Sequence, residues 1–246
     1  MTKILVIGDS CIDIYSYCKS NRLAPDKPVP VLEVVDTVET PGMAFNVFNN
    51  ALSLSNDPKG IDLLTNPNYQ EVTKNRYVDQ SSNHMFLRVD SSTQVERLVR
   101  KEIDKEYDTV IISDYDKGFL TIEDIEYICT HHQQVFLDTK KVLDNWANAA
   151  RFIKINNHEY ERSKEYFQNV GVVDKVIQTM GGGGCCYNGK IYSVEEQDVM
   201  DVSGAGDTFM AALAVKYTES NDMIMSIEFA NQCAAKVVRK KGTTVV

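Results

Sequence analysis

The chain has 246 residues, of which 43% are hydrophobic, and it carries a formal net charge of −9. This length suffices for one substantial core but not for two full α/β domains. The negative charge disfavours nucleic acid as a partner, because its phosphates would be repelled.

The cysteines and the apolar runs exclude other protein classes. The six cysteines form no Cys-x-x-Cys pair and have no histidine at zinc-binding spacing, so reduced thiols are expected. No apolar run approaches the ~20 residues of a membrane-spanning helix. The N-terminus leads directly into a predicted strand, without a signal-peptide pattern. We therefore expect a cytoplasmic protein with no membrane partner.

Short apolar runs alternate with amphipathic segments along the chain. The first run, Lys3–Gly8, is continuous and ends in glycine, which is typical of a strand buried on both faces of a parallel sheet. Further strands of this kind are predicted at 109–113, 135–138, 152–155 and 175–179, and helices at 95–107, 122–130 and 159–167. The alternation predicts an α/β fold with a mainly parallel sheet, whose ligands bind at the carboxyl ends of the strands.

A second, smaller sheet is predicted from different segments. Ile12–Cys18 and Val29–Thr37 alternate in polarity or are rich in β-branched residues, and prolines lie between and within them. Because proline cannot donate to a ladder, these should be edge or protruding strands. With His84–Asp90 they predict a lid over the active site, drawn from about 12–38 and 84–90. An ordinary edge hairpin of the main sheet is the alternative.

Polar side chains follow several of the predicted strands. Asp13 comes shortly after the first strand, and Gly42 and Asn46 lie where the next helix opens. Carboxylate, backbone amide and carboxamide groups together suit sugar hydroxyls. Taken singly, Asp13 is also typical of a turn and Asn46 of a helix start. Asp114 and Lys117 follow a later strand, where they either face phosphate and metal or form a surface ion pair.

The segment Asp201–Phe209 carries the clearest chemical signal. Its small residues Gly204, Ala205 and Gly206 let backbone N–H groups approach a ligand, and the helix that follows favours anions at its start. Asp207 is then placed to take a proton from an attacking hydroxyl. In isolation, the same pattern is also typical of a helix cap.

This segment resembles the signature Asp-x-x-Gly-Ala-Gly-Asp of the ribokinase-like (PfkB) family of carbohydrate kinases. The resemblance implies one ribokinase-like kinase domain over residues 1–246, built as a three-layer sandwich with a β-sheet lid. It implies ATP and Mg²⁺ as cofactors, the Gly204–Gly206 backbone as the anion hole and Asp207 as the general base. The lid often serves as a dimer contact in the family, which implies a homodimer.

The resemblance also implies roles on both sides of the base. Asn156 and Glu159 match the family's Asn-x-x-Glu motif, which helps to place the divalent ion near the phosphates. The implied nucleotide-binding residues are Asn156, Thr179, Gly181, Gly184 and Asn231, and the implied sugar-binding positions include Asp13, Gly42 and Asn46. A flexible glycine hairpin at 181–184 and a core position for Asn231 are the alternatives.

Four stretches resemble one branch of the family, the kinase domain of the bifunctional enzyme that makes ADP-heptose: residues 8–15, 22–31, 113–118 and 241–245. That branch acts on D-glycero-β-D-manno-heptose 7-phosphate, so the resemblance implies a phosphorylated sugar as the acceptor. Cations such as Arg22, Lys27 or Arg88 would then meet its phosphate.

Two other functions stay open. Met43 and Phe45 are bulkier than the family's residues at the sugar, and residues 54–73 form a shorter segment than usual. Both features suit a non-catalytic sugar- or nucleotide-binding regulator on the same scaffold. A nucleoside kinase is the third hypothesis.

Overall fold

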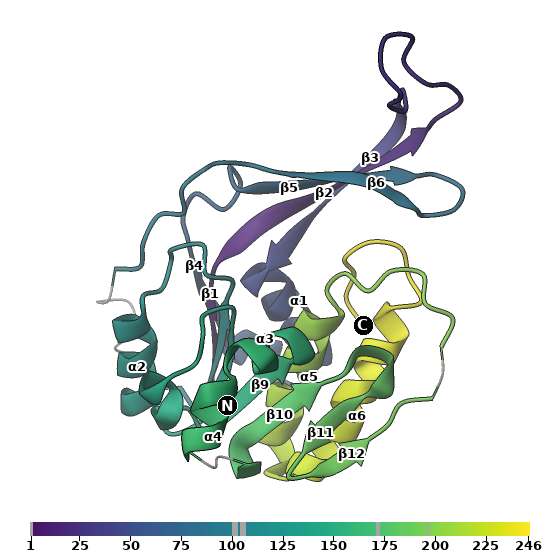
Figure 1. The fold of residues 1–246 in the computed structure, drawn as a ribbon. Coiled ribbons are helices and arrows are strands. Elements are labelled where there is room, and N and C mark those ends of the chain that lie inside the picture. Colours follow the sequence, from purple (N-terminus) through teal and green to yellow (C-terminus); the bar gives the residue numbers. More distant parts are fainter. Residues whose placement is uncertain (1, 100–102, 104–106, 171–172, 196) are drawn as a thin grey trace.

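The body of the molecule is built on an eight-stranded sheet, and a separate four-stranded sheet lies above it (Figure 1). Figure 1 is a computed structural model, which describes residues 2–99, 103, 107–170, 173–195 and 197–246. None of the described helices has the length and apolar character needed to cross a membrane. All six cysteines are free thiols.

The central sheet has the strand order β12-β11-β10-β9-β8-β7-β1-β4. Its strands are β1 (Ile4–Gly8), β4 (Ile61–Thr65), β7 (Thr109–Asp114), β8 (Val135–Thr139), β9 (Phe152–Asn156), β10 (Val176–Thr179), β11 (Cys185–Tyr187) and β12 (Lys190–Tyr192). The strands from β10 to β4 are parallel, whereas β11 and β12 form an antiparallel extension. Five of the parallel strands were predicted, because each is a short apolar run.

Helices cover both faces of this sheet, which gives the predicted three layers. One face packs against α1 (Ala44–Leu54), α5 (Ala205–Ser220) and α6 (Met223–Val237). The other packs against α2 (Ile122–His131), α3 (Asn157–Arg162), α4 (Lys164–Val170) and the 3-10 helix η3 (Asn145–Ala149). Short 3-10 turns are η1 (Pro58–Gly60), η4 (Val173–Lys175) and η5 (Gly181–Gly183). The predicted α/β class is confirmed.

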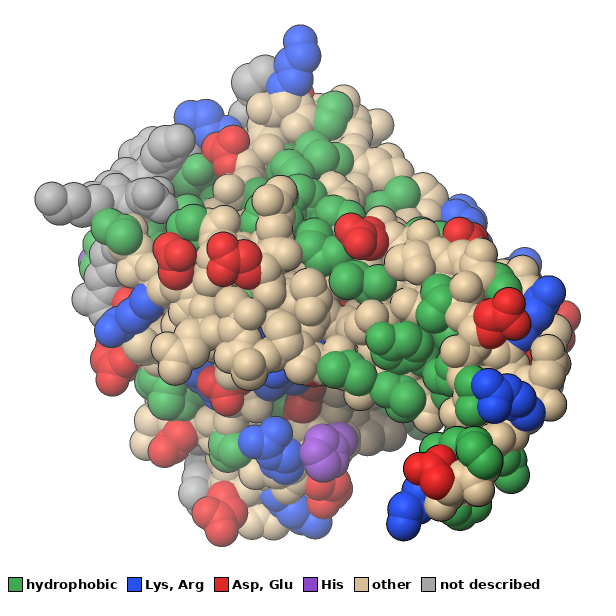
Figure 2. All heavy atoms as spheres, turned by 90° about the horizontal axis from the view of Figure 1, so that it is seen from above, with side chains coloured by type: hydrophobic (Ala, Val, Ile, Leu, Met, Phe, Trp, Pro, Cys, Tyr) green, Lys and Arg blue, Asp and Glu red, His purple; other side chains and the backbone are tan. Residues whose placement is uncertain are grey.

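The lid sheet has the order β3-β2-β5-β6, and its strands are β2 (Ser10–Lys19), β3 (Glu33–Met43), β5 (Thr73–Asp79) and β6 (Met85–Asp90). Seen from above, hydrophobic side chains are spread over the side of the molecule on which this sheet lies (Figure 2). The lid differs from the prediction in two ways. β2 is an internal strand, because β3 and β5 pair with its two edges, and the prolines at 25, 28 and 30 lie in the loop between β2 and β3. The strand β5 was not predicted.

Two helix predictions were wrong in detail. Residues 95–99 of the predicted helix 95–107 are not helical, and 100–102 and 104–106 lie outside the described residues. The predicted helix 159–167 is divided into α3 and α4 at the buried Ser163. The Ser163 hydroxyl accepts a hydrogen bond from the Leu143 backbone N–H at 3.0 Å, which ties the break to the neighbouring loop.

Candidate active site

Asp207 lies in the first turn of α5 and is 5% exposed. Its Oδ1 accepts a hydrogen bond from the Tyr115 hydroxyl at 2.6 Å, and its Oδ2 accepts one from Asn46 Nδ2 at 3.0 Å. Burial raises the pKa of Asp207 above its usual value, and the two hydrogen bonds oppose this effect. A carboxylate that is oriented by two donors and made more basic by burial is suited to act as a general base.

The turn before Asp207 depends on glycine. Gly204 is the N-cap of α5 with φ 76°, in the left-handed region that favours glycine, and a Cβ there would lie 2.7 Å from Asn46 Nδ2. The turn opens a 16-residue helix whose first N–H groups have no partner within the helix. The backbone of 204–207 lines a cavity of about 800 Å³, where these donors favour an anion.

Sequence reasoning gave no role to two lysines that also line this cavity, Lys140 and Lys154. Lys154 Nζ would be 3.3 Å from a Cβ placed on Gly206, so its charge lies beside the start of α5. It pairs with Asp138 at 2.7 Å, and both side chains are almost fully buried. A lysine inside an apolar strand, opposite an aspartate in the neighbouring strand, is the signal that could have identified the pair.

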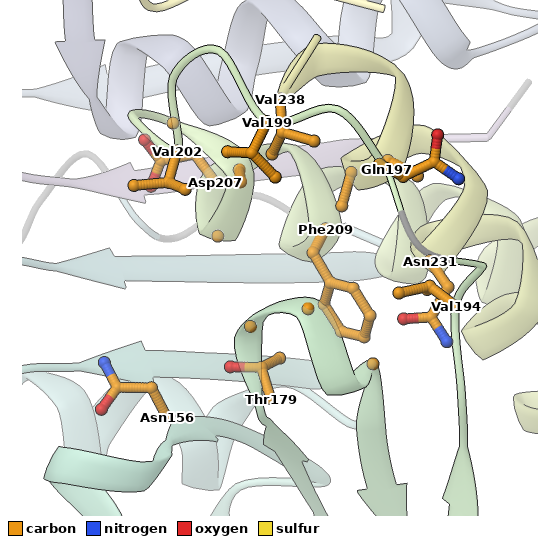
Figure 3. Close-up of a pocket in the computed structure, with 18 of the residues that line it drawn as sticks. Asn156, Thr179, Val194, Gln197, Val199, Val202, Asp207, Phe209, Asn231 and Val238 are labelled. Carbon is orange, nitrogen blue, oxygen red and sulfur yellow. The ribbon is translucent and has the colours of Figure 1, made fainter.

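The cavity has a polar end and an apolar end (Figure 3). Tyr115, Lys140, Asn156 and Thr179, at or just after the carboxyl ends of β7, β8, β9 and β10, form its polar end. The other end is lined mainly by the apolar residues Val194, Val199, Phe209, Ala234 and Val238, with Gln197 and Asn231 among them, and the turn at Gly181–Gly184 borders it. This division suits a nucleotide, with its base in the apolar slot and its phosphates among the cations.

The Asn-x-x-Glu motif forms a capping box at the start of α3. The Asn156 side chain accepts from the Glu159 N–H, and Glu159 Oε2 accepts from the Asn156 N–H, both at 2.9 Å. Glu159 Oε1 is bonded to Lys140. By contrast, Asp138 Oδ1 is buried with no hydrogen-bond partner among the described residues. The described residues contain no cluster of three or more His, Cys, Asp or Glu side chains that could hold a metal ion. Mg²⁺ prefers oxygen ligands and keeps several of its waters, so the unpartnered Asp138 Oδ1 is the group here that suits contact with such an ion or one of its waters.

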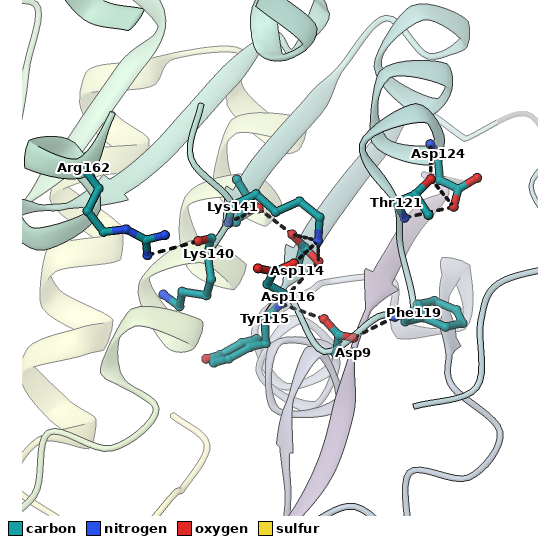
Figure 4. A network of polar contacts seen from close by, with 11 residues as sticks. Asp9, Asp114, Tyr115, Asp116, Phe119, Thr121, Asp124, Lys140, Lys141 and Arg162 are labelled. Atoms are coloured by element: carbon teal, nitrogen blue, oxygen red, sulfur yellow. Dashed lines mark hydrogen bonds and ion pairs between the residues drawn. The ribbon is translucent and has the colours of Figure 1, made fainter. Parts of the chain in front are cut away.

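The loop after β7 is held from below by Asp9, which is fully buried (Figure 4). Its carboxylate accepts hydrogen bonds from the backbone N–H of Tyr115 at 2.7 Å and of Phe119 at 3.1 Å. The Tyr115 side chain is thereby presented to Asp207. Sequence reasoning missed this contact because the two residues are 92 positions apart.

Asp114 does not pair with Lys117, which was one of the two alternatives. Its buried carboxylate is bonded to Lys141 Nζ at 3.1 Å and to the Thr139 hydroxyl at 2.5 Å, whereas Lys117 is exposed. Burial raises the pKa of Asp114 to about 6, and Lys141 opposes this shift. The carboxylate thus joins the ends of β7 and β8, and it does not line the cavity.

Of the predicted acceptor residues, Asp13 and Gly42 lie on the lid strands β2 and β3, and Asn46 lies in α1, which directly follows β3. A Cβ on Gly42 would be 2.2 Å from Asp13 Oδ2, so a larger residue there would displace the Asp13 carboxylate. Asp13 forms a buried ion pair with Arg76 at 2.5 Å, and Asn46 contacts Asp207.

The bulky residues next to this site have packing partners of their own. Met43 is buried with Cys11 and Val72, and the Phe45 ring contacts Phe48 and Tyr69. Their size is therefore explained by packing within the protein.

Residues 111–246, more than half of the chain, match the pattern that defines the pfkB family carbohydrate kinases. The chain belongs to this family. It is 30% identical to the bifunctional protein HldE of Helicobacter pylori strain J99 over an alignment that includes all of this chain and 64% of the relative. The chain thus spans less than two thirds of that relative.

Two solved kinase structures share the fold of this chain. Ribokinase from Arabidopsis thaliana, complexed with ribose and ATP, superposes with a TM-score of 0.72 at 16% identity, covering 98% of this chain and 94% of that one. The nucleoside kinase of Methanocaldococcus jannaschii gives 0.70 at 17% identity, with coverages of 99% and 93%. The predicted ribokinase-like fold is confirmed.

Proposed function

We propose that this kinase transfers the γ-phosphate of ATP to a hydroxyl of a sugar phosphate, and that the acceptor is a heptose 7-phosphate. The observation that carries the proposal is the position of Asp207. It lies between a cavity suited to a nucleotide and the acceptor residues Asp13 and Asn46, at a helix start that favours anions. The similarity to HldE along the whole chain supports a heptose phosphate.

In this proposal the residues bind the nucleotide, bind the acceptor sugar and remove one proton from it. The adenine base enters the apolar slot beside Asn231, and the phosphates reach the Thr179–Gly184 turn and Lys154. Asp207 takes the proton of the acceptor hydroxyl as the hydroxyl oxygen bonds to the γ-phosphorus and the bond to the bridging oxygen of ADP breaks. The amides at the start of α5 and Lys154 offset the charge of the transferred group. A hydrated Mg²⁺ held through Asp138 and Glu159 would neutralise charge on the triphosphate.

The test is ADP release from ATP and magnesium with heptose, hexose and pentose phosphates, free sugars and nucleosides. Turnover with the heptose phosphate supports the proposal, and turnover confined to nucleosides would select the nucleoside kinase. The Asp207→Asn variant should lose about 10²- to 10⁴-fold in kcat, the usual contribution of a general base, while it still binds nucleotide. Binding of sugar phosphate and nucleotide without turnover in the unaltered protein would instead favour the regulator.

We also propose that the lid mediates a homodimer. Leu87 and Val89 on β6 are about half exposed, and strand alternation places both on the face opposite Arg88. The register sets Tyr77 beside Leu87, and Ile14 lies in the same row as Val89. An apolar strip on a sheet that stands clear of the body suits association with a second copy.

A further inference from the structure

The inner face of the lid, which looks onto Asp207, carries several positive charges. Strand pairing sets Asp13, Lys74 and Asp90 in one row across β2, β5 and β6, and Tyr15, Arg76 and Arg88 in the next row on the same face. This face points toward the loop after β7, because Lys74 Nζ lies 4.8 Å from the centre of the Tyr115 ring. The Tyr115 hydroxyl is bonded to Asp207.

Lys117 lies in the loop after β7, two residues after Tyr115, whose ring contacts Lys74. The pKa of Asp90 lies below its usual value, chiefly through the hydrogen bond from Arg88 and further through the nearby charges of Lys74 and Lys117. Lys74, Arg76, Arg88 and Lys117, the acceptor-side cations, thus face three carboxylates, Asp13, Asp90 and Asp207. This local excess of positive charge stands out in a chain whose net charge is −9.

The carboxylates leave part of this charge unpaired. Arg76 is paired with Asp13, while Arg88 uses Nε and Nη2 to hold Asp90, both at 2.6 Å. Among the described residues, Arg88 Nη1 has no hydrogen-bond partner, and neither Lys74 nor Lys117 has a carboxylate within 4.0 Å. Arg88 is also 44% exposed, so it can reach a ligand beneath the lid.

We propose that Lys74, Arg88 and Lys117 form a subsite for the phosphate that the acceptor sugar already carries. The subsite rests on the proposed function. It names the residues that would select a phosphorylated sugar over a neutral one. A phosphate dianion supplies oxygen acceptors for guanidinium and ammonium groups. The nucleotide has cations of its own, because Lys140 and Lys154 line its cavity and the acceptor-side cations do not.

This assignment changes one expectation from the sequence. Arg88 stays a candidate, but Arg22 and Lys27 are exposed in the loop between β2 and β3, at the far end of the lid (Figure 1). Lys74 and Lys117 take their place. The lysine in β5 was overlooked because the strand itself was not predicted.

The test compares phosphorylated and free forms of one sugar in the Arg88→Gln, Lys117→Gln and double variants. Both side chains are exposed enough for neutral replacements to be tolerated. Each loss of a charged hydrogen bond should raise the KM for heptose 7-phosphate about 10- to 100-fold. The KM for the free heptose and for ATP should not change. Lys59→Gln, an exposed lysine in η1 before β4, is the matched control.

The outcomes separate the subsite from the kinase reaction. An equal loss with phosphorylated and free sugar would overturn the subsite and assign these cations to the transferred phosphate. An unchanged KM for the sugar phosphate would overturn it as well. If the unaltered protein turns over no sugar phosphate, the proposed function fails. In that case, the binding of heptose 7-phosphate is measured by calorimetry without ATP. A dissociation constant at least tenfold higher for the double variant than for the unaltered protein upholds the subsite, and no binding by the unaltered protein refutes it.

Discussion

Replacing Tyr115 by phenylalanine tests how Asp207 is prepared for catalysis. The change removes the 2.6 Å hydrogen bond to Asp207 Oδ1 and keeps the ring, which lies 4.8 Å from Lys74 Nζ and 5.3 Å from Lys140 Nζ. A hydrogen bond to a charged group contributes about 1.5–3 kcal/mol. At 1.36 kcal/mol for each factor of ten, kcat/KM should fall roughly 10- to 150-fold.

The pH profile distinguishes this role from simple packing. The Tyr115 hydrogen bond lowers the pKa of Asp207 against the effect of burial, so its loss should raise that pKa further. The base must be ionised to act, and the acid limb of kcat/KM against pH should therefore move to higher pH in Tyr115→Phe. Tyr166→Phe, which removes a hydroxyl bonded to Asn148 on the other face of the sheet, is the control. A lower rate with an unmoved acid limb would refute the reasoning.

Three further variants probe the acceptor site, the buried ion pair and the lid. In Gly42→Ala, the added methyl would lie 2.2 Å from Asp13 Oδ2, so the acceptor KM should rise while the ATP KM is unchanged; equal effects on both substrates would contradict this. Lys154→Met leaves Asp138 as an unpaired buried charge and should lower the free energy of unfolding in urea by about 3–5 kcal/mol. A decrease in the free energy of unfolding of less than about 1 kcal/mol would show that water reaches the Asp138 carboxylate. Leu87→Glu should yield monomers in sedimentation velocity if the lid face joins two copies, and an unaltered dimer would place the contact elsewhere.

The parts of this protein that follow from local sequence were predicted well. The strands β1, β7, β8, β9 and β10 are continuous apolar runs, and burial on both faces of a parallel sheet requires that composition wherever the strand lies. The turn at Gly204 is equally local, because a left-handed backbone and a close ligand approach both demand small residues. The α/β class and the turn that positions Asp207 could therefore be predicted from local sequence, and the resemblance of the Asp201–Asp207 segment to a family signature added the ribokinase-like fold.

The partners of these residues were decided only by the tertiary structure. β5 has few apolar residues and gains its place by pairing with β2 and β6, so no local pattern identifies it. The Tyr115–Asp207 contact and the Lys154–Asp138 pair depend on which strand ends lie side by side. Strand register decided that Lys74 and Arg88 share the inner face of the lid, because a shift by one residue turns a side chain to the opposite face.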